Sequence, residues 1–135
     1  MGQASLILLD THVLIWLTSS PERLSPLART AISEARQAGE ELAIVDISLL
    51  ELALLAKKGR VLLGMDLSGV LDSIEARFAI RSVSTRACVK SIELPKSYPK
   101  DPADRIIGAT AIVEGVPLIT ADANIRKAKA VRTIW

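Results

Sequence analysis

The sequence contains one cysteine, one histidine and few aromatic residues, and each scarcity excludes a class of protein. Cys88 has no partner, so an internal disulfide framework is excluded, and we expect it to pack as a small apolar side chain. A single histidine and a single cysteine cannot form a zinc site of the usual kind. No Gly-rich loop follows a predicted strand, which excludes phosphate-loop and dinucleotide-binding folds.

Long apolar runs are also missing. None approaches the roughly 20 residues of a membrane span, and the segment 1–5 lacks the basic residues of a signal peptide. We therefore expect a soluble, cytoplasmic protein with no membrane partner. The length of 135 residues fits one domain over 1–135. Half of the residues are hydrophobic, which favours a dimer or another partner that covers apolar surface.

The net charge of +2 is too small to indicate nucleic-acid binding by itself, but the charge is unevenly placed. After Asp122 the chain carries only basic charged residues: Arg126, Lys127, Lys129 and Arg132. Such a run is either a solvated face or a surface for RNA, and the sequence leaves both open.

Short apolar runs alternate with helical patterns along the whole chain. The predicted strands are 6–9, 42–45, 78–83, 116–120 and 131–134. The predicted helices are 11–18, 25–38, 48–58, 67–77, 86–94, 102–114 and a short one after Asp122, with 60–64 as a connection or short helix. This alternation predicts an α/β fold, a three-layer α/β/α sandwich around a parallel sheet of four or five strands.

The predicted helix 48–58 has no polar face. Leucines and alanines surround it, and a helix that is apolar all round is expected to be covered all round. One side can pack on the sheet, whereas the other needs a neighbouring helix or another protein.

Four carboxylates lie next to apolar segments, where a bare charge is costly unless something compensates it. They are Asp10, Glu51, Asp104 and Asp122. Asp10 and Asp122 follow predicted strands, and Glu51 and Asp104 lie in the first turn of predicted helices. Because parallel sheets bind ligands beyond the carboxyl ends of their strands, all four are expected at one edge of the sheet.

A shared divalent metal would compensate these charges. Mg²⁺ and Mn²⁺ prefer carboxylate and water oxygens, and one or two such ions can activate water and neutralise a scissile phosphate. Metal-assisted cleavage of a phosphodiester is therefore the leading hypothesis.

Helix capping is the alternative interpretation of these acids. Ser48 and Glu51 have the spacing of a capping box, and Asp10 and Asp122 are placed to cap the helices that follow them. Capping does not explain why all four lie at one predicted edge. We assign Asp101 to capping rather than to the metal, and Asp46 to a loop.

Several neighbouring polar residues are candidates for supporting roles. The hydroxyls of Thr11 and Thr120 are expected to hold the acids or a water, whereas capping is favoured for Ser48. His12 is an unfavoured general base, because a lone histidine needs placed geometry to act. Other basic residues have two interpretations each: Arg105 contacts phosphate or forms a surface ion pair, and Lys57, Lys58 and Arg60 steer RNA or solvate a helix end.

Four segments together resemble the motifs of PIN-domain proteins, with the closest likeness to VapC-type toxins of bacterial toxin–antitoxin pairs. They are 9–16 (LDTHVLIW), 48–51 (SLLE), 101–107 (DPADRII) and 118–122 (LITAD). The resemblance implies a PIN-like fold and a Mg²⁺- or Mn²⁺-dependent endoribonuclease. It implies metal ligation by Asp10, Glu51, Asp104 and Asp122. It further implies an RNA substrate, a homodimer, and an antitoxin whose C-terminal segment lies in an apolar groove.

Other functions stay open at this stage. A catalytically silent PIN-like binding module and a metal-dependent DNA nuclease share the same pattern. A haloacid-dehalogenase-like phosphatase is disfavoured, because His12 stands where its second aspartate should follow Asp10. The RNA target, the number of metal ions and the identity of the antitoxin are not encoded in any motif of the chain.

Overall fold

The computed structural model describes residues 6–60 and 64–135, which form a parallel five-stranded sheet in the order β3-β2-β1-β4-β5. The strands are β1 (Leu6–Leu9), β2 (Glu41–Val45), β3 (Ala79–Arg81), β4 (Leu118–Ile119) and β5 (Thr133–Ile134). The helices are α1 (Thr11–Ser19), α2 (Pro26–Gln37), α3 (Ile47–Lys57), α4 (Leu67–Arg77), α5 (Thr85–Glu93), α6 (Pro102–Glu114) and α7 (Ala123–Ala128), with a 3-10 turn η1 (Pro21–Arg23) after α1.

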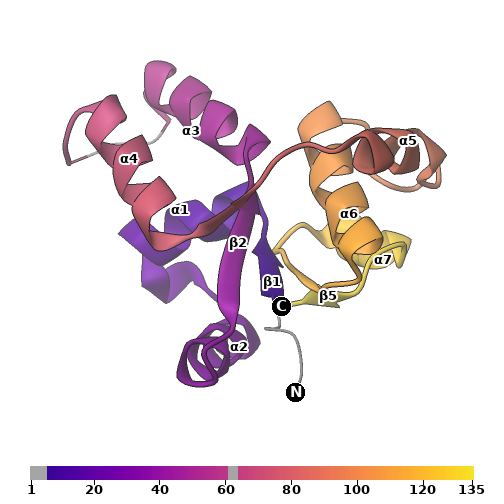
Figure 1. Ribbon diagram of the computed structural model, residues 1–135, viewed down its shortest axis with the longest axis horizontal. Helices are drawn as coiled ribbons and strands as arrows, with labels where there is room; N and C mark the ends of the chain where they lie inside the picture. The colour runs from indigo at the N-terminus through magenta and orange to yellow at the C-terminus, as the bar shows by residue number, and fades with distance from the viewer. Residues whose placement is uncertain (1–5, 61–63) are drawn as a thin grey trace.

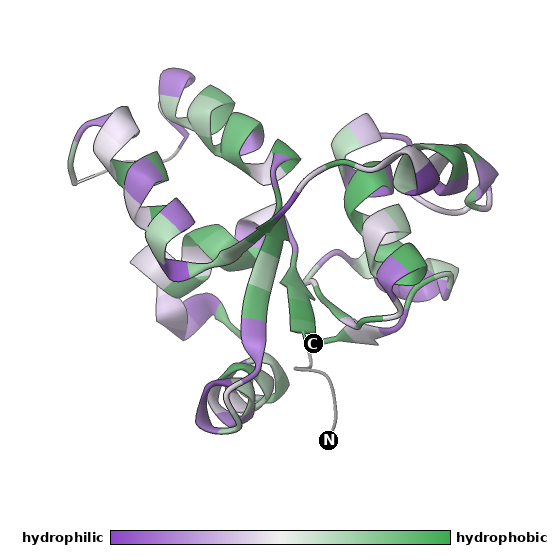
Figure 2. Ribbon diagram, in the orientation of Figure 1, coloured by the Kyte–Doolittle hydropathy of each residue, from purple (hydrophilic) through white to green (hydrophobic). Residues whose placement is uncertain are grey.

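The sheet separates two hydrophobic cores. Successive residues of a strand point to opposite faces, so Ile7 and Leu9 enter one core while Leu6 and Leu8 enter the other. Helices α1 to α4 cover the first face, and α6 and α7, with α5 packed on α6, cover the second (Figure 1). Strand β1 is hydrophobic along its whole length, and β2 is hydrophobic after Glu41, its exposed first residue (Figure 2). The predicted three-layer fold with a parallel sheet is confirmed.

The element boundaries differ modestly from those predicted. The three later strands are shorter than predicted, because their ends turn into the loops that carry polar residues. Helix α5 starts at Thr85, one residue earlier than predicted, since the Ser84 hydroxyl accepts a hydrogen bond from the Ala87 amide (3.0 Å). The predicted connection 60–64 includes residues 61–63, which lie outside the described residues. No helix within the described ranges has the length and apolarity needed to cross a membrane.

The packing expectation for Cys88 was wrong. Cys88 is exposed rather than packed, because α5 buries Ala87 and Ser91, one turn apart, and Cys88 lies beside that face.

Helix α3 has one face that no described residue covers, since Leu50 and Leu54 are 53% and 46% exposed. These leucines are four residues apart and share one face. Within residues 6–60 and 64–135 no neighbouring helix supplies the cover that was expected, and cover by another protein stays a prediction.

The first turn of α6 is anchored by Tyr98, in the loop that precedes the helix. Tyr98 is 1% exposed, and its hydroxyl donates a hydrogen bond to the backbone carbonyl of Asp104 (3.3 Å). Its ring lies against Gly108, where an added Cβ would be 2.0 Å from the tyrosine oxygen. The absence of a side chain at position 108 therefore leaves the space in which the Tyr98 ring packs against α6.

Gly108→Ala is expected to lower the free energy of unfolding by about 1–3 kcal/mol through overpacking, although alanine is intrinsically the better helix former. Gly69→Ala is the matched control in α4, where the added Cβ meets only the ends of two side chains, Asp66 at 3.0 Å and Met65 at 3.3 Å. The control should be neutral or stabilising by roughly 0.5–1 kcal/mol. Urea denaturation of both variants measures this, and an equally stable Gly108→Ala would show that Tyr98 does not fill this space.

Candidate metal and catalytic site

The four predicted acids line one pocket of about 340 Å³ at the carboxyl edge of the sheet. Asp10 comes from the end of β1, Glu51 from α3, Asp104 from the first turn of α6, and Asp122 from the residue before α7. The structure thus brings together side chains that lie up to 112 positions apart in the sequence, as the parallel arrangement predicted.

Asp10 is the most constrained of the four acids and is 7% exposed. One carboxylate oxygen accepts a hydrogen bond from the Thr11 amide (2.9 Å), and the other accepts one from the Thr120 hydroxyl (2.7 Å). The Asp10 amide also donates to the carbonyl of Ile119 (3.0 Å), which extends the pairing of β1 with β4. The carboxylate is therefore held in one orientation from both sides.

Thr11 connects the first helix to the third. Its hydroxyl donates a hydrogen bond to Glu51 and lies 2.8 Å from the Ser48 hydroxyl. Because a threonine hydroxyl has one proton, and that proton goes to Glu51, Ser48 must donate to Thr11 in turn. The supporting contacts predicted for Thr11 and Thr120 are present in the structure.

The predicted capping role of Ser48 is wrong. Helix α3 begins at Ile47, with Asp46 at the N-cap position, so Ser48 already lies inside the helix. Its side chain is fully buried against Thr11. Glu51 likewise turns toward Thr11, so the sequence spacing of a capping box is not used as one.

Asp122 has two roles in the structure. Its Oδ1 atom accepts hydrogen bonds from the amides of Asn124 (2.8 Å) and Ile125 (3.1 Å), which caps α7 as the capping interpretation predicted. The Asp122 amide donates to the Thr120 hydroxyl (3.1 Å), and that hydroxyl in turn holds Asp10. Asp122 is thus a cap that also lines the acidic pocket.

Asp101 was assigned to capping, and the structure corrects this assignment. It stands at the N-cap position of α6, yet its side chain makes no capping hydrogen bond and lines the acidic pocket. Its position three residues before Asp104 is the signal that could have placed it there, since both lie at the same helix start. A fifth carboxylate therefore adds negative charge to the site.

Arg105 forms no ion pair with a described side chain, so that predicted role is wrong, whereas the predicted phosphate contact stays a prediction. Its guanidinium donates to the backbone carbonyls of Ser91 (3.1 Å), Tyr98 (3.3 Å) and Pro95 (3.4 Å). The side chain therefore ties the loop before α6 to α5, and it does not enter the pocket. Its positive charge leaves the acids uncompensated.

Burial and mutual repulsion raise the pKa of the pocket carboxyls. Burial raises the pKa of Asp104 from 3.8 to about 7, with further increases from the charges of Asp10, Asp101, Glu51 and Asp122. Burial also raises the pKa of Asp10, against the hydrogen bonds from Thr120 and Thr11. For Glu51, burial raises the pKa while the Thr11 hydrogen bond opposes it. No lysine or arginine lines the pocket, and the charge of His12 opposes the increase only as a lesser cause for Asp10 and Glu51.

The donor set suits a hard divalent cation. Every candidate ligand is a carboxylate, and the raised pKa values indicate carboxylates that a cation would stabilise. Within residues 6–60 and 64–135, however, no three His, Cys, Asp or Glu side chains lie close enough to hold an ion as they stand. The chemistry of the donors fits a metal, and the pocket is an acidic cavity rather than an assembled coordination sphere.

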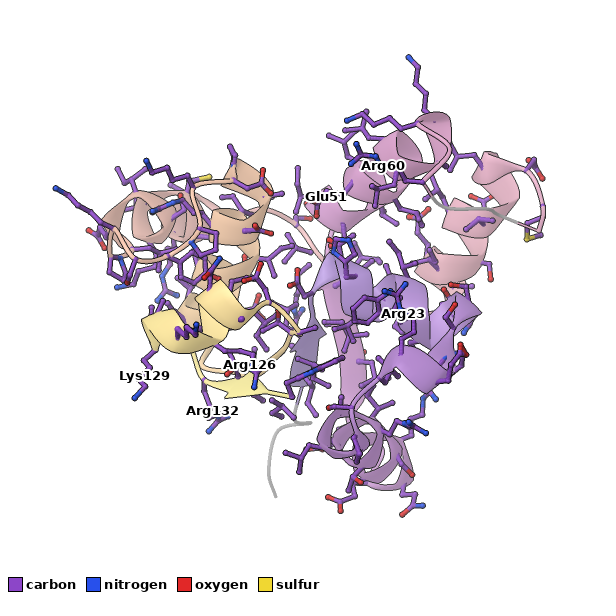
Figure 3. All side chains as sticks on the ribbon, turned by 180° about the vertical axis from the view of Figure 1, so that it is seen from behind. Arg23, Glu51, Arg60, Arg126, Lys129 and Arg132 are labelled. Carbon is purple, nitrogen blue, oxygen red and sulfur yellow. The ribbon has the colours of Figure 1, made fainter. Side chains whose placement is uncertain are left out.

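Other residues frame the pocket. His12 and Trp16 also line it, and Trp16, the last residue of the segment 9–16, had been given no role. The basic C-terminal residues Arg126, Lys129 and Arg132 lie on the opposite side of Glu51 from Arg23 and Arg60 (Figure 3). None of these C-terminal residues lines the acidic pocket.

Comparison with known proteins identifies the family. The PIN-domain profile matches residues 7–131. Ribonuclease VapC22 of Mycobacterium tuberculosis is 37% identical over 131 residues, covering 96% of this chain and 98% of that protein.

Two solved structures share the fold. VapBC2 from Rickettsia felis, bound to a DNA fragment from its promoter, has a TM-score of 0.71 at 19% identity and covers 95% of this chain and 96% of its own. A toxin–antitoxin complex from Klebsiella pneumoniae has a TM-score of 0.58 at 28% identity and covers 86% of each chain. PIN-domain ribonucleases depend on a divalent metal. The chain belongs to the PIN-domain family and to its VapC type.

Proposed function

We propose that this chain is a metal-dependent endoribonuclease and the toxin of a type II toxin–antitoxin pair. The observation that carries the proposal is the pocket in which Asp10, Glu51, Asp104 and Asp122 converge with no compensating cation from the described side chains. The 37% identity to a VapC ribonuclease over nearly the whole chain supports RNA as the substrate.

The proposed reaction is hydrolysis of a phosphodiester bond. A water oxygen bonds to phosphorus while the bond to the in-line ribose oxygen breaks. The water's proton passes to solvent or to a pocket carboxylate, and the leaving ribose oxygen takes up a proton from solvent to become a hydroxyl. Bound Mg²⁺ or Mn²⁺ would lower the pKa of that water and neutralise charge on the phosphate. The four acids would hold the ion, and no protein nucleophile takes part.

The protein's own contribution is orientation. Thr11 and Thr120 fix both oxygens of Asp10 through short contacts, and Thr11 also fixes Glu51. Side chains held in this way lose little entropy when they bind an ion. The five carboxylates of the lining also repel RNA phosphate until a cation is present, which makes cutting depend on the metal.

Asp10→Asn is expected to abolish metal-dependent cleavage of RNA, with a loss of at least about a hundredfold, because several kcal/mol of charge stabilisation depend on the ion. Folding should be retained, since asparagine can accept from Thr11 and donate to Thr120. The measurement is cleavage of total cellular RNA with Mg²⁺, with Mn²⁺ and with EDTA.

Asp66→Asn is the matched control for this substitution, because Asp66 also caps a helix through its side chain (3.3 Å to the Gly69 amide) but lies outside the pocket. The control should cut as the parent does. Equal cutting by Asp10→Asn would contradict the site, and cutting of DNA but not RNA would favour a DNA nuclease. If the folded parent cuts neither, a silent binding module becomes the better interpretation.

Stability without metal should fall as pH rises from about 4 to about 7. The pKa of Asp104 is higher in the folded state (about 7) than its ordinary value of 3.8, so the folded state binds the proton more tightly in this window. Above pH 7 this effect is complete. In EDTA, Asp104→Asn should show a smaller fall and a higher Tm than the parent at pH 7. Added Mg²⁺ should raise the Tm of the parent.

Asp72→Asn provides the control for pH dependence, because Asp72 is exposed on α4. The stability of this variant should change with pH as that of the parent does. Identical slopes for the parent and Asp104→Asn, measured by thermal denaturation across the window, would contradict the raised pKa.

We also infer two protein partners from exposed apolar faces. Leu50 and Leu54 lie on α3, the same helix that carries Glu51. This position suits an antitoxin segment that reaches the acidic pocket. The α5 face of Val89 and Ile92 is 51% and 83% exposed and lies in a different part of the molecule (Figure 1). We assign this second face to a homodimer.

The two assignments predict separable effects. Leu54→Glu should weaken the complex with the protein encoded beside the toxin gene by about tenfold or more, because a charge would be buried in an apolar contact. The same variant should leave the dimer intact. Ile92→Glu should do the reverse. Sedimentation of each variant, alone and mixed with the neighbouring protein, measures both. Each variant is the control for the other, and loss of both associations in either one would contradict the division.

A further inference from the structure

A second pocket adjoins the acidic one. Its volume is about 550 Å³, and it shares two lining residues, His12 and Trp16, with the acidic pocket. The rest of its lining comes from the end of α1, from η1 and from the C-terminal part of α3 and the residues after it. The two pockets therefore form one continuous surface that runs from the acids toward Arg23 and Arg60.

The second pocket has the opposite charge. Arg23 and Arg60 line it, and no carboxylate does. Neither arginine forms an ion pair with any side chain in the described part of the protein. Both are exposed, so their positive charge is available to an anion.

An aromatic ring lies between the acids and the arginines. The guanidinium of Arg23 is 4.5 Å from the centroid of the Trp16 ring, a cation–π arrangement that holds the arginine over the indole. His12 lies on the other side along α1, with its ring 6.0 Å from that of Trp16. The Trp16 side chain is only partly buried, so it presents aromatic surface to the pocket.

We propose that this pocket binds an unpaired nucleotide of the RNA substrate next to the bond that is cut. Trp16 and the guanidinium of Arg23 stack with the base, and Arg60 contacts a neighbouring phosphate. Single-stranded nucleic acid is commonly bound by a stacking platform beside positive charge, and bases stack on indole rings and on guanidinium planes. The inference rests on the proposed ribonuclease function and adds the residues that hold a base and a phosphate beside the bond that is cut.

The charges favour RNA over a peptide in this pocket. A basic peptide would be attracted to the acids but repelled by Arg23 and Arg60. In Figure 3, these two arginines lie on the same side of Glu51, whereas the C-terminal basic residues lie on the other side. An RNA strand that crosses the acids would thus meet arginine and an aromatic ring directly beside them.

The test is binding of a fluorescein-labelled short single-stranded RNA to the full chain in EDTA, where cleavage cannot occur. Arg23→Gln and Arg60→Gln should each weaken binding severalfold. Arg60→Gln should also lower the slope of log K against log salt by about 0.7, the value for one lost phosphate contact on a single strand. Arg23→Gln should act through the loss of stacking and change this slope less. The same RNA in a duplex should bind more weakly than the single strand.

Arg77→Gln is the matched control. The Arg77 guanidinium also lies over an aromatic ring, 5.6 Å from the Phe78 centroid, but it lines a pocket away from the acids. This variant should bind RNA as the parent does. All three arginines are exposed, so the substitutions should leave the fold intact.

Stacking on Trp16 has its own readout. Trp135→Phe leaves Trp16 as the sole tryptophan of the chain. Single-stranded RNA should quench its fluorescence, and adding Arg23→Gln should reduce the affinity measured from that quenching. Trp16→Leu should weaken binding by about tenfold, since stacking on one base has that order of effect.

Unchanged affinity and salt slope in Arg23→Gln and Arg60→Gln, together with no quenching of Trp16, would overturn the inference. So would variants that bind RNA normally but lose the neighbouring-gene protein, because the pocket would then belong to a peptide. These outcomes are distinct from failure of the ribonuclease proposal, in which the parent does not cut RNA with any metal. Binding is measured without metal and without cleavage.

Discussion

Negative charge gathers at one edge of the sheet without an equal positive charge beside it. Five carboxylates line one pocket, and the nearest arginine in sequence, Arg105, donates instead to backbone carbonyls. Burial and repulsion then raise the pKa of Asp104 to about 7. Most features of the site depend on this imbalance. It favours the binding of a cation, and it makes the folded protein without metal less stable than one in which these charges are compensated.

Hydroxyl groups make this charged edge possible. The Thr120 hydroxyl bridges Asp10 and the amide of Asp122, and the Thr11 hydroxyl bridges Glu51 and Ser48 while the Thr11 amide holds Asp10. Neutral hydroxyls orient carboxylates without neutralising them, so the negative charge stays available to an ion. The contact between α1 and α3 through Thr11 also sets the spacing of these two helices. Trp16 lies farther along α1, and Arg60 follows the end of α3. The same two helices therefore help to line both the acidic pocket and the arginine-lined pocket.

The parallel sheet and the pocket acids were predictable from local pattern, because both depend on which residue types follow apolar runs. The errors arose where one residue had two possible partners. Ser48 has the sequence position of a cap, but the buried Thr11 hydroxyl takes its side chain. Asp101 stands at a helix start, yet its carboxylate lines the pocket without capping. Cys88 is small and apolar, but the face of α5 that packs is one residue away.

The sequence by itself determined the order of strands and helices and the presence of acids at strand ends and helix starts. Periodicity and turn residues act over a few positions, so they can be read along the chain. Only the tertiary structure decided that Thr11 reaches Glu51 across 40 positions, and that Arg23 and Arg60 share a pocket with Trp16. These pairings depend on how helices pack across a sheet and on where side chains point, and neither is fixed by local sequence.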